Sequence, residues 1–237
     1  MRERHSLKRA SNQSVSIMSA GAAASTVPAW RAALKHALKR NGRNPTSKYA
    51  QIATIDAETG APRVRTVVIR GFLGEYLSAA TKDTAGDALV FCTDARSGKI
   101  PDIAKDSRSE IAWYFPETRE QFRVTGTLTT SRSSADADAE EDEDEARKNL
   151  WKKMRRGARG QFLWPTPGGA RAVVEDGERD PHDVAEDDPA LDDETVSANF
   201  TLVALRPTRI DHLHLKKNER HVHEDVHGEW VTTRVNP

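Results

Sequence analysis

Short apolar runs separated by turn-forming residues dominate the chain from residue 49 onward. They predict strands at residues 49–55, 63–72, 89–93, 111–115, 121–129, 200–205, 209–215, 221–226 and 230–235. Helical spacing is confined to residues 30–40, 97–104 and 142–154. Because a doubly wound parallel sheet needs a long helix between successive strands, that architecture is excluded. The pattern predicts a mainly β (α+β) fold, an antiparallel sheet closed into a barrel with a few peripheral helices.

The charge of the chain is unevenly distributed although its formal sum is zero, with 36 basic and 36 acidic residues. Residues 136–145 contain eight acids and no Lys or Arg, and residues 175–194 contain eleven acids against Arg179 alone. The rest of the chain therefore carries a net charge of +18. Low apolar content and mutual repulsion predict flexible acidic inserts at about 131–145 and 173–197 of a basic domain.

The first 29 residues are rich in Ser, Ala, Arg and Lys and contain one acid, Glu3. This composition is typical of a mitochondrial or plastid transit peptide and equally of a disordered leader. We expect one domain over residues 30–237, located in the cytoplasm, or in the mitochondrion or plastid if the leader is a targeting signal. No apolar run is long enough to span a membrane. The single cysteine, Cys92, excludes an internal disulfide and is interpreted as a small core residue.

Four segments carry residues that core packing does not require, at 65–71, 93–99, 113–123 and 161–165. In the first, Arg65 and Arg70 place cations at both ends of an apolar strand. In the second, hydroxyls, a guanidinium and an ammonium converge where a strand meets a helix that Ser97 is expected to cap, which is a phosphate-binding arrangement. The third combines aromatic rings with the amide of Gln121, suited to a planar heterocycle.

The order of these segments, RTVVIRG, TDARSGK and WYFPETREQFR with a final VNP, resembles the FMN-binding domain of the pyridoxamine 5'-phosphate oxidase-like proteins. The resemblance covers about residues 30–237 without the acidic inserts. It implies a six-stranded antiparallel split β-barrel, a homodimer, and FMN in clefts at the dimer interface. It further implies an oxidoreductase whose flavin accepts a hydride from a small-molecule substrate and is reoxidised by O₂.

The same resemblance implies the residues that would contact the cofactor. Those expected to border the phosphate and the isoalloxazine are Arg65, Thr66, Val67, Val68 and Arg70. Those expected to hold the phosphate are Thr93, Ser97 and Lys99, with Arg96 assisting. Gln121 would lie against the flavin ring, and Gln161 would approach from the second subunit.

The elements that meet substrate in the authentic oxidase match this chain only partly, at Arg159, Arg220 and His221. FMN binding is therefore better supported than oxidation of pyridoxamine phosphate, and no catalytic residue is assigned. The alternative function is a flavin-binding or interaction module without turnover. Nucleic-acid binding through the basic residues 148–159 is disfavoured because the acidic inserts would compete with phosphate. The expected partners are a second copy and a small substrate, with no membrane.

Five of the eight histidines lie within residues 212–227. A hairpin loop at residues 216–219 would pair His214 with His221 and His212 with His223, which puts four imidazoles on one face. Such a face could bind Zn²⁺ or Ni²⁺. The alternative interpretation is a solvated outer face without metal, or a side of the barrel that meets the acidic insert.

Overall fold

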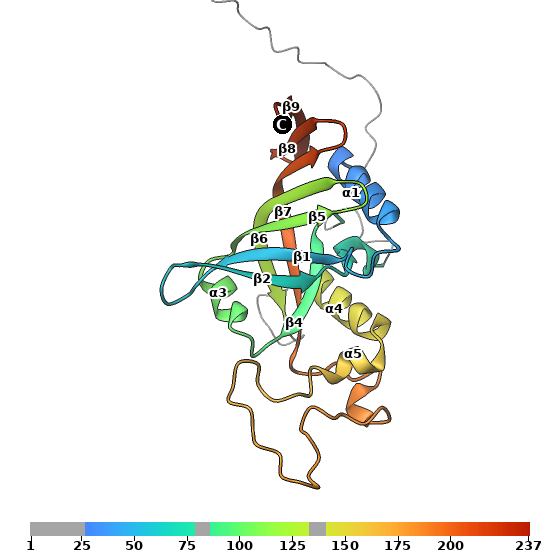
Figure 1. Cartoon of the computed structure of the whole chain (residues 1–237), viewed down its shortest axis with the longest axis vertical. Coiled ribbons are helices and arrows are strands. Elements are labelled where there is room, and N and C mark those ends of the chain that lie inside the picture. Colours follow the sequence, from blue (N-terminus) through green and yellow to red (C-terminus); the bar gives the residue numbers. More distant parts are fainter. Residues whose placement is uncertain (1–26, 79–85, 133–140) are drawn as a thin grey trace, which may run out of the picture.

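The computed structural model describes residues 27–78, 86–132 and 141–237, which form one antiparallel sheet with helices at its margins (Figure 1). The strands are β1 (Tyr49–Ile55), β2 (Pro62–Val68), β3 (Gly71–Phe72), β4 (Leu89–Asp94), β5 (Arg108–Phe115), β6 (Glu120–Ser131), β7 (Phe200–His214), β8 (Glu219–Val226) and β9 (Glu229–Val235). The helices are α1 (Ala29–Arg40), α3 (Lys99–Lys105), α4 (Glu141–Lys153) and α5 (Arg156–Gly160), with 3-10 turns at Leu73–Glu75 and Pro189–Leu191.

The sheet follows the order β2-β1-β5-β6-β7-β4-β3, and β8 and β9 extend it from β7. Its ladder is not closed, but the chain itself joins the two ends at the bend between β2 and β3. There the Ile69 amide donates to the Lys48 carbonyl at 2.8 Å, and the Arg70 amide donates to the Val90 carbonyl at 2.7 Å. The mainly β fold with an antiparallel split barrel is confirmed, although the described sheet contains nine strands rather than six.

Two differences from the predicted strands have local causes. The single strand expected at residues 63–72 is divided into β2 and β3, because residues 69 and 70 bond to different neighbouring strands. The strands expected at 200–205 and 209–215 form one strand, β7, which carries an irregularity opposite Gly126. A Cβ on Gly126 would lie 2.0 Å from the Arg206 carbonyl oxygen, so only glycine allows the two strands to approach there.

The apolar residues form two clusters on opposite faces of the sheet. The barrel interior contains the aromatic rings of Trp113, Phe115 and Phe122, and α1 covers one end through Trp30 and Leu34. The second cluster lies between α4 and the outer side of β4 and β7. Its aromatic members Trp151, Phe162 and Phe200 contact one another edge to face. Cys92 is half-buried and packs against this second cluster, consistent with a small core residue.

The β7–β8 hairpin has a register two residues away from the predicted one. His214 pairs with Glu219, and His212 pairs with His221 rather than with His223. The loop spans residues 215–218, one residue earlier than expected, because Asn218 adopts a left-handed conformation with φ of 53° that asparagine tolerates. The predicted pairing was therefore wrong, although a shift of two residues keeps the four imidazoles on one face.

The two acidic segments differ in their secondary structure and in which of their residues pack against the domain. Residues 133–140 lie outside the described part of the chain, whereas residues 141–145 form the first turn of α4, where Glu143 is buried. The segment 173–197 has little regular structure, but Leu191 is buried and the Asp192 carbonyl accepts a hydrogen bond from the Trp151 indole at 2.8 Å. The flexibility of these segments stays a prediction, as does the leader, of which residues 1–26 are not described.

The helix expected to begin at Ser97 instead begins at Lys99, and no side chain caps it. Ser97 Oγ accepts a hydrogen bond from Lys99 Nζ, so the hydroxyl serves the lysine rather than the helix end. Among the described residues, no helix is long and apolar enough to cross a membrane.

Candidate functional site

Lys99, Thr93 and Ser97 meet where β4 ends and α3 begins. Lys99 Nζ donates to Thr93 Oγ1 and to Ser97 Oγ, both at 2.7 Å. Burial lowers the pKa of the Lys99 ammonium, and the nearby positive charge of Arg65 lowers it further. The structure therefore concentrates positive charge beside two hydroxyls in a partly dehydrated place, where an anionic ligand would be attracted.

Arg65 lies beside this lysine and is held by a buried carboxylate. Its Nη2 is 3.2 Å from Asp102 Oδ2, and its Nη1 donates to Thr54 Oγ1 at 2.5 Å. Asp102 is 1% exposed, and its other oxygen accepts the Ala57 amide at 3.0 Å. Sequence reasoning missed Asp102 as the residue that orients Arg65. The sequence does contain a signal for this residue, because Asp102 lies among the apolar residues Ile100 and Ile103 of a short helix.

Arg70 brings a third cation from the bend between β2 and β3. Its side chain reaches the Cys92 thiol, whose pKa is raised by burial while the charges of Arg70 and Lys99 oppose that rise. The thiol therefore stays protonated and uncharged. The Nε of Arg70 is buried and has no hydrogen-bond partner among the described residues. Since a buried N–H without an acceptor is costly, this atom is suited to an anionic ligand.

The Arg96 side chain is already hydrogen-bonded to other residues of the chain. Its guanidinium bonds both oxygens of Asp94, at 2.9 and 2.7 Å, and donates to the Trp164 carbonyl at 2.8 Å. It therefore ties the segment after α5 to the end of β4. Gln161 is exposed and lines a cavity of about 310 Å³ in this segment together with Trp164 and His182. The predicted approach of Gln161 to the flavin from a second subunit stays a prediction.

Thr66, Val67 and Val68 lie on β2, which pairs with β1 and with no other strand of the described residues. Val67 is buried in the barrel, while Thr66 and Val68 face outward. Because an edge strand has backbone groups without a strand partner, part of this backbone can hydrogen-bond a heterocycle.

Arg65, Arg70 and Lys99 together form a cationic cluster. Within one chain, Gln121 lies far from this cluster. It pairs with Leu213 near the end of β7, whereas Thr93 pairs with Thr201 near the start of that strand. The twelve residue steps from Thr201 to Leu213 correspond to roughly 40 Å along the strand. The described chain therefore does not bring Gln121 together with Lys99.

The three candidates for substrate binding occupy other roles. Arg159 is 2% exposed and donates to the carbonyls of Trp151, Leu191 and Lys152 at 2.8 to 3.0 Å, so its donors are used within the core, and its predicted substrate role stays a prediction. Arg220 bonds both oxygens of the buried Asp211, at 2.9 and 2.6 Å. His221 lies half-exposed opposite His212.

The histidine face is packed rather than open. His212 stacks on Phe122 with ring centroids 4.1 Å apart and bonds Glu120 at 2.8 Å. His223 is 4% exposed, and burial lowers its pKa to about 4, with the charges of His212 and His221 acting in the same direction. Within the part of the chain that the structure describes, no three His, Cys, Asp or Glu side chains are arranged to hold a metal ion.

A dianionic phosphate matches the donor set of the cluster. Arg65, Arg70 and Lys99 carry three positive charges, Asp102 balances one, and the Arg96–Asp94 pair is neutral, which leaves +2. Thr93, Ser97 and the unpartnered Arg70 Nε supply further hydrogen-bonding atoms. The fold is that of a split-barrel protein, and the cationic cluster has the charge and the hydrogen-bond donors that the phosphate of a flavin mononucleotide requires.

The comparisons with known proteins agree with this class. Residues 27–132 match the family model for the pyridoxamine 5'-phosphate oxidase FMN-binding domain. The chain is 30% identical over 216 residues to pyridoxine/pyridoxamine 5'-phosphate oxidase 2 of Arabidopsis thaliana, covering 89% of this chain and 98% of that protein. The chain belongs to the pyridoxamine 5'-phosphate oxidase family of FMN-binding proteins.

Solved structures give the same result for the fold. A pyridoxamine 5'-phosphate oxidase-related FMN-binding protein of Nostoc punctiforme is 36% identical with a TM-score of 0.75, and the match covers 89% of this chain and 99% of that one. PhzG of Burkholderia lata is 17% identical with a TM-score of 0.59, over 87% of this chain and 91% of that one, which shows a shared fold. FMN is the cofactor of this family, and the cluster fits its phosphate.

Proposed function

We propose that the protein is an FMN-dependent oxidoreductase that acts on a small substrate of the pyridoxamine or pyridoxine 5'-phosphate class. The observation that carries the proposal is the net charge of +2 around Lys99, with the buried Arg70 Nε available to a ligand. The name of the Arabidopsis relative, which this chain matches over nearly its whole length, supports the substrate class.

In this proposal Lys99 and Arg70 bind the cofactor phosphate, and Thr93 and Ser97 complete the contacts through their hydroxyls. Asp102 keeps Arg65 oriented toward the same place, since its carboxylate is buried beside the guanidinium. The bound isoalloxazine supplies the hydride acceptor. The residues of β2 and the segment around Gln161 border the ring and limit the access of water.

A homodimer completes the site. Gln121 is expected to contact the flavin ring, but roughly 40 Å of β7 separates it from the cationic cluster of its own chain. It therefore contacts FMN only from a second copy. The outer face of β1, β2 and β5 exposes Tyr49, Val64 and Tyr114 at 46, 66 and 47%. Apolar side chains on one sheet face are suited to burial against a second copy.

The test has two readouts. The purified protein is expected to be yellow, with one FMN per chain released on heating. Supplied with pyridoxamine 5'-phosphate and O₂, the FMN-loaded protein is expected to form the aldehyde and hydrogen peroxide in equal amounts. A colourless protein that FMN cannot reconstitute would contradict both cofactor and activity.

A flavin-binding module without turnover is the second candidate. The observation in its favour is that Arg159 is committed to the core and that Arg220 is bound by Asp211. A yellow protein that forms no peroxide with either vitamer would identify this second function.

A further inference from the structure

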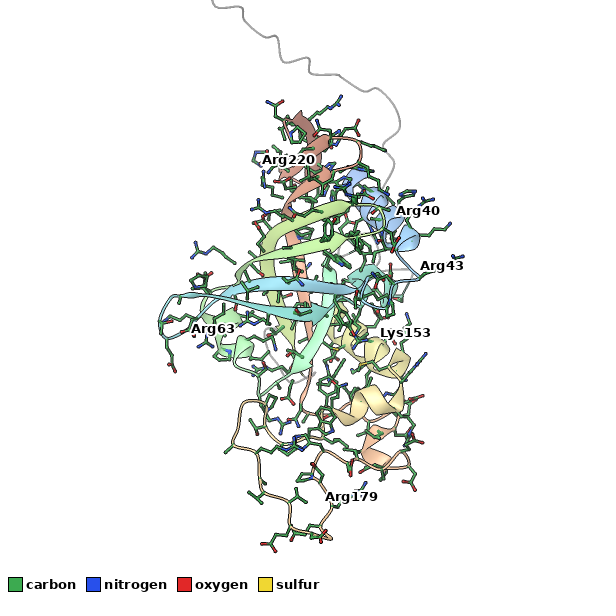
Figure 2. The ribbon with its side chains drawn as sticks, viewed as in Figure 1. Arg40, Arg43, Arg63, Lys153, Arg179 and Arg220 are labelled. Atoms are coloured by element: carbon green, nitrogen blue, oxygen red, sulfur yellow. The ribbon has the colours of Figure 1, made fainter. Side chains whose placement is uncertain are left out.

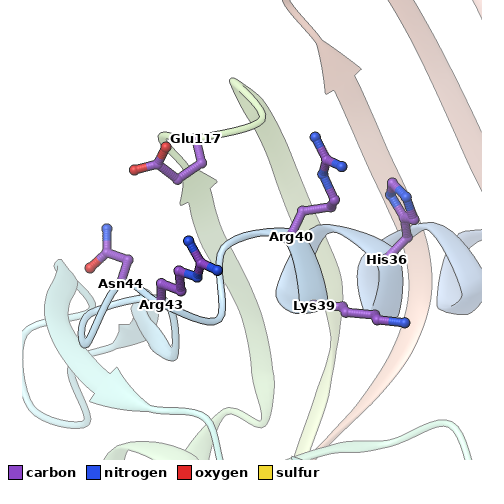
Figure 3. Close-up of a pocket in the computed structure, with 6 residues that line it drawn as sticks. All are labelled: His36, Lys39, Arg40, Arg43, Asn44 and Glu117. Atoms are coloured by element: carbon purple, nitrogen blue, oxygen red, sulfur yellow. The ribbon is translucent and has the colours of Figure 1, made fainter.

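A cavity of about 790 Å³ lies at the end of α1, between the helix and the turn that joins β5 to β6 (Figure 3). Its lining residues are His36, Lys39, Arg40, Arg43, Asn44 and Glu117. In the close-up, Arg43 and Asn44 lie across from Glu117, with Arg40 beside them. The cavity shares no residue with the proposed FMN cluster.

The basic residues of this cavity differ from the other cations of α1. Arg31 and Lys35 have carboxylate partners, Asp87 at 2.5 Å and Glu75 at 3.8 Å. No ion pair joins Lys39, Arg40 or Arg43 to another of the residues that the structure describes. With Glu117 as the single acid in the lining, the cavity has a formal charge of +2 when His36 is neutral.

The helix dipole explains the position of only some of these basic residues. Lys39 and Arg40 lie in the last turn of α1, where cations are favourable. Arg43 lies beyond the helix end. Lys39, Arg40 and Arg43 line one cavity and carry the same charge, so they repel one another. A cationic group gathered against its own repulsion is consistent with an anionic ligand.

The two walls of the cavity are joined by a buried asparagine. Asn41 is fully buried, and its Nδ2 donates to the Ala37 carbonyl at 2.9 Å and to Thr118 Oγ1 at 3.2 Å. Its Oδ1 accepts the Glu117 amide at 2.9 Å. These bonds fix the end of α1 against the β5–β6 turn, so the cationic side chains project from a preorganised backbone.

We propose that this cavity is a second anion site, which binds a small diphosphate or a similar anion with two or more negative charges. Arg40 and Arg43 supply paired N–H donors to the phosphate oxygens, as guanidinium groups do in other phosphate sites. Lys39 adds a positive charge at the margin of the cavity, and the His36 imidazole adds a hydrogen-bonding group. Glu117 lowers the affinity, and its repulsion limits binding to strongly anionic ligands.

The experiment is calorimetric titration of the FMN-loaded protein with inorganic pyrophosphate, so that the cofactor site is already filled. We expect one pyrophosphate per chain, with an affinity that falls as salt is added. The double variant R40Q/R43Q should raise the Kd at least about tenfold, since two charge-assisted contacts are lost. Glu117→Gln should lower the Kd, because the opposing charge is removed.

The matched control is R155Q/R179Q, which removes two exposed arginines that do not line the cavity; Arg179 lies near the lower end of the molecule, far below Arg40 and Arg43 (Figure 2). Its Kd should equal that of the unmodified protein. No heat with pyrophosphate, or an equal Kd in R40Q/R43Q, would overturn the proposal. If a single-stranded oligonucleotide binds more tightly than pyrophosphate and R40Q/R43Q abolishes that binding, the proposal is overturned in favour of a nucleic-acid surface. An unchanged Kd in Glu117→Gln would also contradict it.

Discussion

Replacing Lys99 by methionine isolates the contribution of one ammonium group to FMN binding. Methionine keeps the length of an unbranched side chain but cannot donate to Thr93 Oγ1 and Ser97 Oγ, each of which lies 2.7 Å from Lys99 Nζ. The barrel core does not depend on this group, because Lys99 lies at the first residue of α3. The variant should therefore fold and bind the cofactor more weakly.

The magnitude follows from the kind of contact removed. A charge-assisted hydrogen bond contributes about 1.5–3 kcal/mol, which corresponds to an increase of roughly 10- to 150-fold in the Kd for FMN. The loss should be near the upper end, because the ammonium is partly buried and close to Arg65. Because the pKa of Lys99 is lowered, FMN affinity should also begin to fall at a lower pH than for an ordinary lysine, and this pH dependence should disappear in the variant.

Fluorescence titration of the cofactor-free protein with FMN and with riboflavin checks this reasoning. Riboflavin lacks the phosphate, so its affinity should be unchanged in Lys99→Met. Lys105→Met, at the other end of α3, is the matched control and should bind both ligands as the unmodified protein does. An equal loss of FMN and riboflavin affinity in Lys99→Met would refute the placement of the phosphate.

Four further variants test the structural assignments. Arg159→Ala should lower the free energy of unfolding by about 3–5 kcal/mol, because it removes a buried cation bonded to three carbonyls, and leave the KM for substrate unchanged; urea unfolding and steady-state kinetics measure the two. His223 has a folded pKa of about 4 against about 6.5 unfolded, so the unfolded state binds the proton first and stability is lost as the pH falls between these values. Urea unfolding should show a loss of about 2 kcal/mol between pH 7 and pH 5, reduced in His223→Gln. Gly126→Ala should destabilise the protein by about 3 kcal/mol or more, since its Cβ would meet a backbone carbonyl. By contrast, Gly157→Ala should be stabilising by about 0.5–1 kcal/mol in thermal unfolding, because the site is helical and open.

The strands and the cationic cluster were predictable because their signals are local. The strand at residues 49–55 coincides with β1, since the alternation of its side chains between core and solvent is visible in the sequence. Lys99, Thr93 and Ser97 lie within seven residues of one another, so a single strand-to-helix junction brings them together. The fold class was confirmed for the same reason.

The burial of charged residues was not predictable from local pattern. Glu143 lies in a run of acids that indicates a solvated segment, yet it is buried and bonds Arg206 at 2.9 Å. Arg159 lies in a segment that partly matches a substrate-binding motif, and its structural contacts appear only when the carbonyls at the end of α4 and at Leu191 are brought to it. Such partners are brought together by tertiary packing, which a single sequence does not display.

The most direct test of the FMN site is an experimental structure of the protein with the cofactor bound. The account predicts phosphate oxygens within about 3 Å of Lys99 Nζ and Arg70 Nε, and Gln121 of a second copy against the flavin ring. An FMN molecule whose phosphate lies in the cavity at the end of α1, or whose phosphate has no contact to Lys99 and Arg70, would contradict it.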